Sequence, residues 1–333
     1  MQAAPDPTWQ TLSWQAAVVA ALVAALAAVV KGFWALGQQR RELRWKQAEL
    51  ARELVDKWFE WEASNNALRM VDEGLGSYTV DGYGTHQIDP QVDIPRALAV
   101  VGSRDDWQPA SNTDADRMIR KCFDVLFYCL ERVQHSVQIG VVKRDDVVVP
   151  AEYYVRQLAR FYTPIAAYMD YVDFPRAKKF LCSFKAWSEV AKSHERLLAL
   201  RARLNPAFAP DTAYPGASAS SQPGAGSTGH CAAVAAIVQA EFGGRLLQTF
   251  VNGEEHWFNR VSIGDARFDI DLTGDQFGGP EVHVGPPGRL YPHSLERTIN
   301  DLHAETLDRA RRLAARAKLR KVARRLGRQQ AGK

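Results

Sequence analysis

Cys231, His256 and Asp271 follow one another in the last third of this 333-residue chain. Cys231 stands where a Gly/Ser-rich segment gives way to a helical pattern, His256 lies on a predicted strand, and Asp271 lies on the next strand. A thiol at a helix start, an imidazole that takes its proton and a carboxylate that orients the imidazole are the components of an acyl-transfer site. The order of these residues therefore predicts a Cys-His-Asp triad.

The elements around the triad predict an α+β domain. Residues 231–242 are rich in alanine and read as a helix, which Gly243-Gly244 ends in the manner of a C-cap. Strands are expected at 245–251, 254–262 and 267–272, because Asn252-Gly253 is a strong hairpin signal and Gly264-Asp265 turns the chain again. A helix followed by an antiparallel sheet is therefore expected.

The strand register selects the carboxylate. A two-residue loop at 264–265 places Phe258 opposite Asp271, and Phe258 shares a sheet face with His256 because side chains alternate along a strand. Asp271 is then a diagonal neighbour of His256, within reach of a carboxylate–imidazole hydrogen bond. Asp269 faces Arg260 in the same register, so we expect a salt bridge there.

The expected chemistry gives each group one role. Cys231 attacks as a thiolate, His256 forms the ion pair and passes a proton to the leaving group, and Asp271 fixes the imidazole tautomer. The backbone N–H of Cys231 is the expected oxyanion donor, and Gln222 is the weaker candidate for a second one. Taken singly, a cysteine at a helix start and a histidine on a strand are more often structural, so the hypothesis depends on their combination.

No metal or other cofactor is expected. A zinc site would have to use His230, Cys231, His256 and His283, whose spacing fits no zinc finger or ribbon. The other three cysteines (Cys122, Cys129 and Cys182) complete no CxxC pair and no disulfide-like spacing. This cysteine usage is typical of a protein in a reducing compartment.

Several blocks of the C-terminal region resemble the bacterial YunG family. They are Gly229-His230-Cys231-Ala232, Val238-Gln239, Phe242-Gly243-Gly244, His256-Trp257-Phe258-Asn259-Arg260 and Asp271-Leu272-Thr273-Gly274-Asp275-Gln276-Phe277, within residues 229–320. The resemblance implies a papain- or transglutaminase-like layout with Cys, His and Asp in this order, and no settled substrate. The Trp/Pro-rich lead-in expected before the cysteine is replaced here by the Gly/Ser-rich segment.

Residues 14–36 predict a transmembrane helix. They are nearly all Ala, Val and Leu, with Lys31 as the only charge, and a helix of about 20 such residues crosses a hydrocarbon core of about 30 Å. Trp14 and Trp34 fit the two aromatic belts. Four basic residues follow within 40–46, so the positive-inside rule predicts an inner-membrane protein with its N-terminus outside and the bulk of the chain in the cytoplasm.

The middle of the chain predicts an all-α cytoplasmic domain over 38–204, with an amphipathic helix at 114–135 and an irregular stretch at 74–112. It resembles an uncharacterised family of bacterial single-pass membrane proteins with a helical cytoplasmic domain. The matching residues are Arg44-Trp45-Lys46, Asn66-Ala67-Leu68, and the helix from Phe123 to His135 followed by Gly140, Val141 and Asp145. Residues 205–228, rich in Pro, Gly, Ala and Ser, predict a flexible linker before the cysteine domain at 229–333.

The chain ends in a basic tail, since residues 309–333 contain eleven Lys or Arg and no acidic residue. The pattern predicts one long helix over 294–326 with Ser294 as its N-cap. We expect its first half to pack on the cysteine domain and its second half to contact the anionic leaflet of the membrane. Nucleic-acid binding would use the same charges, but no recognised nucleic-acid fold accompanies them.

These features lead to one hypothesis and one rival. The chain is expected to be a membrane-anchored cytoplasmic cysteine enzyme that acts on a protein or peptide substrate by amide or thioester hydrolysis, deamidation or transglutamination. The rival is a non-enzymatic membrane scaffold in which the same domain only binds a partner.

Overall fold

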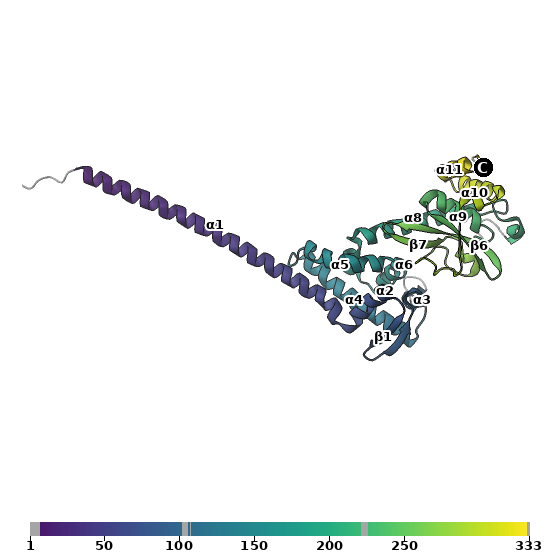
Figure 1. Ribbon diagram of the computed structural model, residues 1–333, viewed down its shortest axis with the longest axis horizontal. Coiled ribbons are helices and arrows are strands. Elements are labelled where there is room, and N and C mark those ends of the chain that lie inside the picture. Colours follow the sequence, from purple (N-terminus) through teal and green to yellow (C-terminus); the bar gives the residue numbers. More distant parts are fainter. Residues whose placement is uncertain (1–6, 102–105, 107, 221–225, 332–333) are drawn as a thin grey trace, which may run out of the picture.

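A long N-terminal helix leads into a helical body, and an antiparallel sheet with its own helices follows at the far end of the molecule (Figure 1). The structure, a computed structural model, describes residues 7–101, 106, 108–220 and 226–331. The chain is therefore an α+β protein, as the sequence predicts.

Helix α1 (Pro7–Glu60) runs without a break through the apolar segment and the charged segment that follows it. Apolar side chains of its first half are exposed, with Leu22 at 65% and Phe33 at 72%, whereas Leu54 and Trp58 near its end are buried in the body. Among the described residues, α1 is the one helix long and apolar enough to cross a membrane, and an N-terminal signal sequence would meet the same criteria.

The helical body is built around α4 (Asp114–Gln138), whose predicted apolar face is buried. A capping box begins this helix, because the Thr113 hydroxyl accepts from the N–H of Asp116 while the Asp116 carboxylate accepts from the N–H of Thr113. The surrounding helices are α2 (Glu62–Glu73), α3 (Pro90–Leu98), α5 (Arg144–Ala159), α6 (Tyr162–Tyr171), α7 (Pro175–Cys182) and α8 (Lys185–Leu204).

The prediction that this body is all-α is wrong, because short strands lie between α2 and α4. They are β1 (Gly76–Val80), β2 (Gly84–Ile88), β3 (Val100–Val101) and β4 (Gln108–Pro109), which pair as two antiparallel hairpins. Inward side chains of the first hairpin, such as Tyr78, are buried, in the alternating pattern of a half-buried strand. The glycines that suggested an irregular stretch include Gly82, which has the positive φ of a hairpin turn.

The C-terminal sheet has the strand order β8-β7-β6-β5-β9. Its strands are β5 (Arg245–Val251), β6 (Glu254–Ile263), β7 (Ala266–Asp271), β8 (His283–Gly285) and β9 (Leu295–Arg297), and helix α9 (Cys231–Phe242) packs on β6. The predicted turns are confirmed, since Val251 pairs with Glu254 and Ile263 with Ala266. In this register Arg260 lies opposite Asp269 and binds it at 2.7 Å, as expected.

A glycine is required where α9 passes into β5. Gly244 has a φ of +83°, and a Cβ atom at this position would lie 2.2 Å from the carbonyl oxygen of Arg260 on the neighbouring strand. The close approach of the two backbones holds α9 against the sheet. Because α9 is apolar on all sides, it is buried between β6 and the C-terminal helices.

The single long helix predicted for 294–326 is wrong. Residues 295–297 are strand β9, which completes the sheet edge beside β5, and the helical part is split into α10 (Ala304–Arg316) and α11 (Arg320–Ala331). Lys318 turns the chain between them with a φ of 60°, and the guanidinium of Arg203 donates to the carbonyl of Lys318. The apolar stripe, including Leu313, Val322 and Leu326, is buried by packing against α9 and between the two helices.

The segment predicted to be a flexible tether is packed against the protein in its described part. It contains two short 3₁₀ helices, η1 (Asn205–Ala207) and η2 (Pro215–Ser220), and Phe208, Thr212 and Ser227 are buried. Composition suggested a tether because small residues dominate, whereas a few apolar and hydroxyl side chains suffice to dock the segment. Residues 221–225 lie outside the described residues, and the domain boundaries stay predictions.

Candidate active site

Cys231 is the first residue of α9 and is partly exposed as a free thiol. The chain reaches it through Gly229, which has a φ of +74° and no room for a Cβ atom, since that atom would lie 2.7 Å from the Cβ of Ala217. The next residue, His230, is buried and bonded through Nε2 to the Thr212 hydroxyl at 3.0 Å and through Nδ1 to the Thr228 carbonyl at 2.9 Å. His230 therefore anchors the lead-in to Cys231.

The structure brings His256 and Asp271 together in the middle of the sheet. Nε2 of His256 lies 2.9 Å from Oδ2 of Asp271, and the two side chains are 0% and 1% exposed. Asp271 accepts further hydrogen bonds from the Tyr291 hydroxyl at 2.6 Å, and from the backbone N–H and hydroxyl of Thr273 at 2.7 and 2.8 Å. All four partners are donors, so they hold the carboxylate in its ionised form.

Gln276 lies at the other end of the imidazole, and Cys231 lies next to the strand that carries His256. Sγ of Cys231 is 3.9 Å from the backbone carbonyl oxygen of Glu255, the residue before His256. The side-chain amide of Gln276 lies 3.1 Å from Nδ1. The imidazole is fixed from the side by the edges of Phe277 and Tyr291, whose ring centroids are 5.0 and 4.9 Å away. His256 and Asp271 are thus in direct contact, and Cys231 lies beside Glu255 on the strand that carries His256.

The charges of this group follow from its hydrogen bonds. Burial lowers the pKa of His256, but the hydrogen bonds with Asp271 and Cys231 outweigh it and raise the pKa to about 9. Burial raises the pKa of Asp271, but the hydrogen bonds from His256, Tyr291 and Thr273 outweigh it and hold that pKa below its usual value. At neutral pH the pair is therefore imidazolium and carboxylate.

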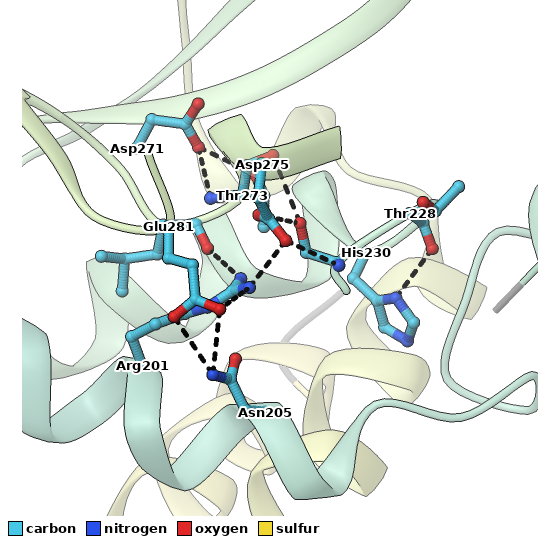
Figure 2. A network of polar contacts seen from close by, with 10 residues as sticks. Arg201, Asn205, Thr228, His230, Asp271, Thr273, Asp275 and Glu281 are labelled. Atoms are coloured by element: carbon cyan, nitrogen blue, oxygen red, sulfur yellow. Dashed lines mark hydrogen bonds and ion pairs between the residues drawn. The ribbon is translucent and has the colours of Figure 1, made fainter. Parts of the chain in front are cut away.

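A second polar network, centred on Arg201 of α8, joins the loop before Cys231 to the loop after Asp271 (Figure 2). The Arg201 side chain is 2% exposed and donates to Asp275 at 2.8 Å. The Ser227 hydroxyl donates to the other carboxylate oxygen of Asp275 at 2.6 Å. Arg201 also donates to the backbone carbonyl of Leu272. Arg201 binds the loop after Asp271, and Asp275 of that loop binds Ser227 of the loop before Cys231, so the helical body takes part in positioning the site.

Sequence reasoning missed several residues that hold this site. Gln276 and Tyr291 touch His256 or Asp271, and Arg201 and Asp275 position the loops. Gln276 and Asp275 stand in the block that begins at Asp271, so proximity in sequence was a usable signal for them. No local signal marks Tyr291 or Arg201. Gln222, the earlier candidate for an oxyanion donor, lies outside the described residues.

The zinc alternative gains no support from the side chains concerned. Both ring nitrogens of His230 are engaged with Thr212 and Thr228, and both of His256 with the groups described above. In the part of the chain that the structure describes, no three His, Cys, Asp or Glu residues are grouped so that they could hold a metal ion.

One comparison with known proteins matches the region that holds these residues. A family model described as YunG protein matches residues 196–312, which include α8 from Arg196 onward, α9, the sheet and most of α10. No curated protein matches the chain, and no solved structure matches it. Because the match begins inside α8, the family region includes Arg201 as well as Cys231, His256 and Asp271. Over residues 196–312, this chain is similar to the YunG family.

Proposed function

We propose that the chain is a membrane-anchored cytoplasmic cysteine enzyme that transfers acyl groups, as an amide or thioester hydrolase, deamidase or transglutaminase-like enzyme. The observation that carries the proposal is the His256–Asp271 pair, joined at 2.9 Å through Nε2, with Cys231 beside it: Sγ of Cys231 lies 3.9 Å from the carbonyl oxygen of Glu255, the residue before His256. A protein or peptide is the proposed substrate class. The thiol is partly exposed while the other two groups are buried, as a nucleophile and its supporting residues should be.

The proposed reaction uses the groups in two steps. The Cys231 thiolate attacks the acyl carbon, the bond to the leaving amine or thiol breaks, and Nδ1–H of His256 protonates the leaving group. Water or an amine then attacks the thioester, losing a proton to His256, and Cys231 leaves as thiolate. Asp271 stays ionised throughout and holds Nε2–H, so that Nδ1 exchanges protons at the reacting face.

Two N–H donors are proposed for the oxyanion of the tetrahedral intermediate. Cys231 is the first residue of α9, and the N–H groups of a helix's first turn have no intrahelical acceptor. The amide of Gln276, placed 3.1 Å from Nδ1 of His256, is the second donor in place of Gln222. A helix that carries the cysteine, packed on an antiparallel sheet that carries His and then Asp, supports the papain- or transglutaminase-like layout.

The acyl-transfer proposal predicts a covalent intermediate on one cysteine. With 4-nitrophenyl acetate, we expect a burst of nitrophenolate and an acetyl group on Cys231, located by peptide mass spectrometry. Asp271→Asn should reduce the burst rate by about 10³-fold or more, because the amide cannot hold the required tautomer. Cys182→Ala removes an exposed thiol away from the site. This variant is the matched control and should keep the burst. Acetyl groups spread over several cysteines, without a burst, would favour the scaffold.

The apolar part of α1 supports anchoring in the bacterial inner membrane as a single pass through residues 14–36. The exposed apolar side chains of this segment pack against no other part of the described protein. Lipid acyl chains would cover them. With the N-terminus outside, the basic residues within 40–46 would face the cytoplasmic leaflet. The remainder of α1 then holds the helical body and the cysteine site in the cytoplasm.

The anchoring proposal predicts where the chain is found after cell lysis. We expect the full chain to stay in the membrane pellet after extraction with alkaline carbonate, and a chain lacking residues 1–37 to move to the soluble fraction. Replacing Lys31 by Ala keeps the apolar span and is the matched control. If cells that express the full chain yield a soluble product that lacks the N-terminal segment, the segment is a cleaved signal sequence instead.

Contact of the basic tail with the anionic leaflet is not part of the proposal. Helices α10 and α11 lie at the end of the molecule opposite the apolar half of α1 (Figure 1). Attraction to charged lipids fades within a Debye length, about 8 Å at physiological salt. A basic tail on the far side of the body would therefore not be attracted to the membrane that holds α1 of the same chain.

A further inference from the structure

A cavity of about 520 Å³ lies between residues 210–215 and the first part of α10. It adjoins the loop that leads to Cys231, because the N–H of Tyr214 donates to the carbonyl of Gly229 at 2.8 Å. Cavities of this size accept a small ligand or one end of a larger substrate. Its place beside the loop that ends at the proposed nucleophile makes its charges a guide to the substrate.

Most charged groups of this cavity are already paired. The carboxylate of Asp211 binds Arg316 at 3.0 and 2.9 Å. The carboxylate of Asp308 binds Arg311 at 2.7 Å and Arg312 at 3.2 Å. The lining therefore holds two carboxylates that are bound by arginines, together with Glu305, Arg312 and Arg309.

Arg309 differs from the other arginines of the cavity. Its guanidinium donates to the Thr306 hydroxyl at 2.9 Å and lies 5.9 Å from the centre of the Tyr214 ring. Within the described part of the chain it makes no ion pair, although Glu305 one helical turn earlier attracts it. Burial lowers the pKa of Arg309, as expected for a cation taken partly out of water without a carboxylate partner.

Arg309 also lies beside the loop that leads to Cys231, since its guanidinium is next to the Tyr214 ring and the N–H of Tyr214 is bonded to Gly229, two residues before Cys231. A guanidinium forms two parallel hydrogen bonds with a carboxylate, and the energy of that contact is larger where water is partly excluded. We propose that this cavity is a subsite in which Arg309 binds a carboxylate of the substrate close to the bond that is cleaved. The inference rests on the proposed function and narrows it to acyl donors that carry a negative charge near the acyl carbon.

The test compares two reagents that differ only in this charge. Iodoacetate and iodoacetamide alkylate a thiol in the same way, but only iodoacetate carries a carboxylate. We expect Arg309→Gln to lower the ratio of their alkylation rates at Cys231 by about tenfold, as for the loss of one charge-assisted hydrogen-bonded pair. Arg309→Lys should lower the ratio less, and Glu305→Gln should raise it.

Arg320→Ala removes an exposed cation of α11 outside the cavity and is the matched control, with an unchanged ratio. An equal ratio in the wild type and Arg309→Gln, or an equal fall in Arg320→Ala, would overturn the subsite. Alkylation needs no turnover, so the two proposals fail separately. A ratio that depends on Arg309 in a protein that forms no acetyl-enzyme would keep the subsite and remove the acyl-transfer reaction.

Discussion

His256→Ala is expected to slow the alkylation of Cys231 by iodoacetamide at neutral pH by about tenfold or more. In the wild type a protonated imidazole, held by Asp271 at 2.9 Å, stands beside the thiol and stabilises its thiolate. Removing the ring removes that cation and leaves Asp271, a negative charge, nearby. The measurement is the rate at which each cysteine is labelled, followed by peptide mass spectrometry.

The other cysteines are internal standards for this experiment. Burial raises the pKa of Cys122 to about 12 and raises the pKa values of Cys129 and Cys182. All three should therefore react slowly, and none should respond to His256→Ala. Equal, slow labelling of all four cysteines in the wild type would contradict the activated thiol and favour the scaffold.

The effect of His256 on the reactivity of Cys231 should depend on pH, because it requires the protonated imidazole. The pKa of His256 is raised from 6.5 to about 9, so its proton stabilises the folded site. This stabilisation is fully present below pH 6.5 and is lost as the pH rises through about 9. The advantage of the wild type over His256→Ala in alkylation should follow the same course, being large near pH 6 and small above pH 9.

Arg201→Met is expected to destabilise the protein by about 3–5 kcal/mol, the usual cost of removing one partner of a buried ion pair. Its guanidinium is 2% exposed, and it holds Asp275 at 2.8 Å while Asp275 accepts from Ser227. Without Arg201, the carboxylate of Asp275 loses its cationic partner and keeps only Ser227 as a donor, and the carbonyl of Leu272 loses its side-chain donor. The measurement is the free energy of unfolding in urea for the full chain in detergent micelles.

Arg203→Ala is the matched control for this prediction, because Arg203 lies on the same helix but is exposed and donates to backbone carbonyls. We expect it to cost less than about 1.5 kcal/mol. The double variant Arg201→Met/Asp275→Asn should recover part of the loss, since the unpaired carboxylate is removed as well. If Arg201→Met and Arg203→Ala lower the free energy of unfolding equally, the buried network contributes no more to stability than the exposed contacts of Arg203.

Local signals were sufficient for the elements next to the site. Asn252-Gly253 and Gly264-Asp265 define two hairpins, and the register that follows from them places Asp269 opposite Arg260. The same register brought Asp271, rather than Asp269, to His256. These predictions succeeded because a turn of two residues determines the pairing of the strands on either side of it.

Local signals misled where distant contacts decide the structure. The apolar stripe of 294–326 suggested one helix, but residues 295–297 gain more by pairing with β5, and the chain reverses at Lys318. The small residues of 205–220 suggested a free tether, but Phe208 is buried and lies under the guanidinium of Arg201. The composition of a segment does not indicate whether another part of the protein offers a surface on which the segment can pack.

The sequence by itself determined the apolar span of α1, the helix that begins at Cys231, and the strands that carry His256 and Asp271, because each depends on neighbours within about ten residues. Only the tertiary structure decided which side chains surround them. Tyr291 at the carboxylate and Arg201 at the loop after Asp271 come from elements that no local pattern joins to the site. Their placement follows from packing a helical body against a sheet, where buried polar groups must find partners far away in sequence.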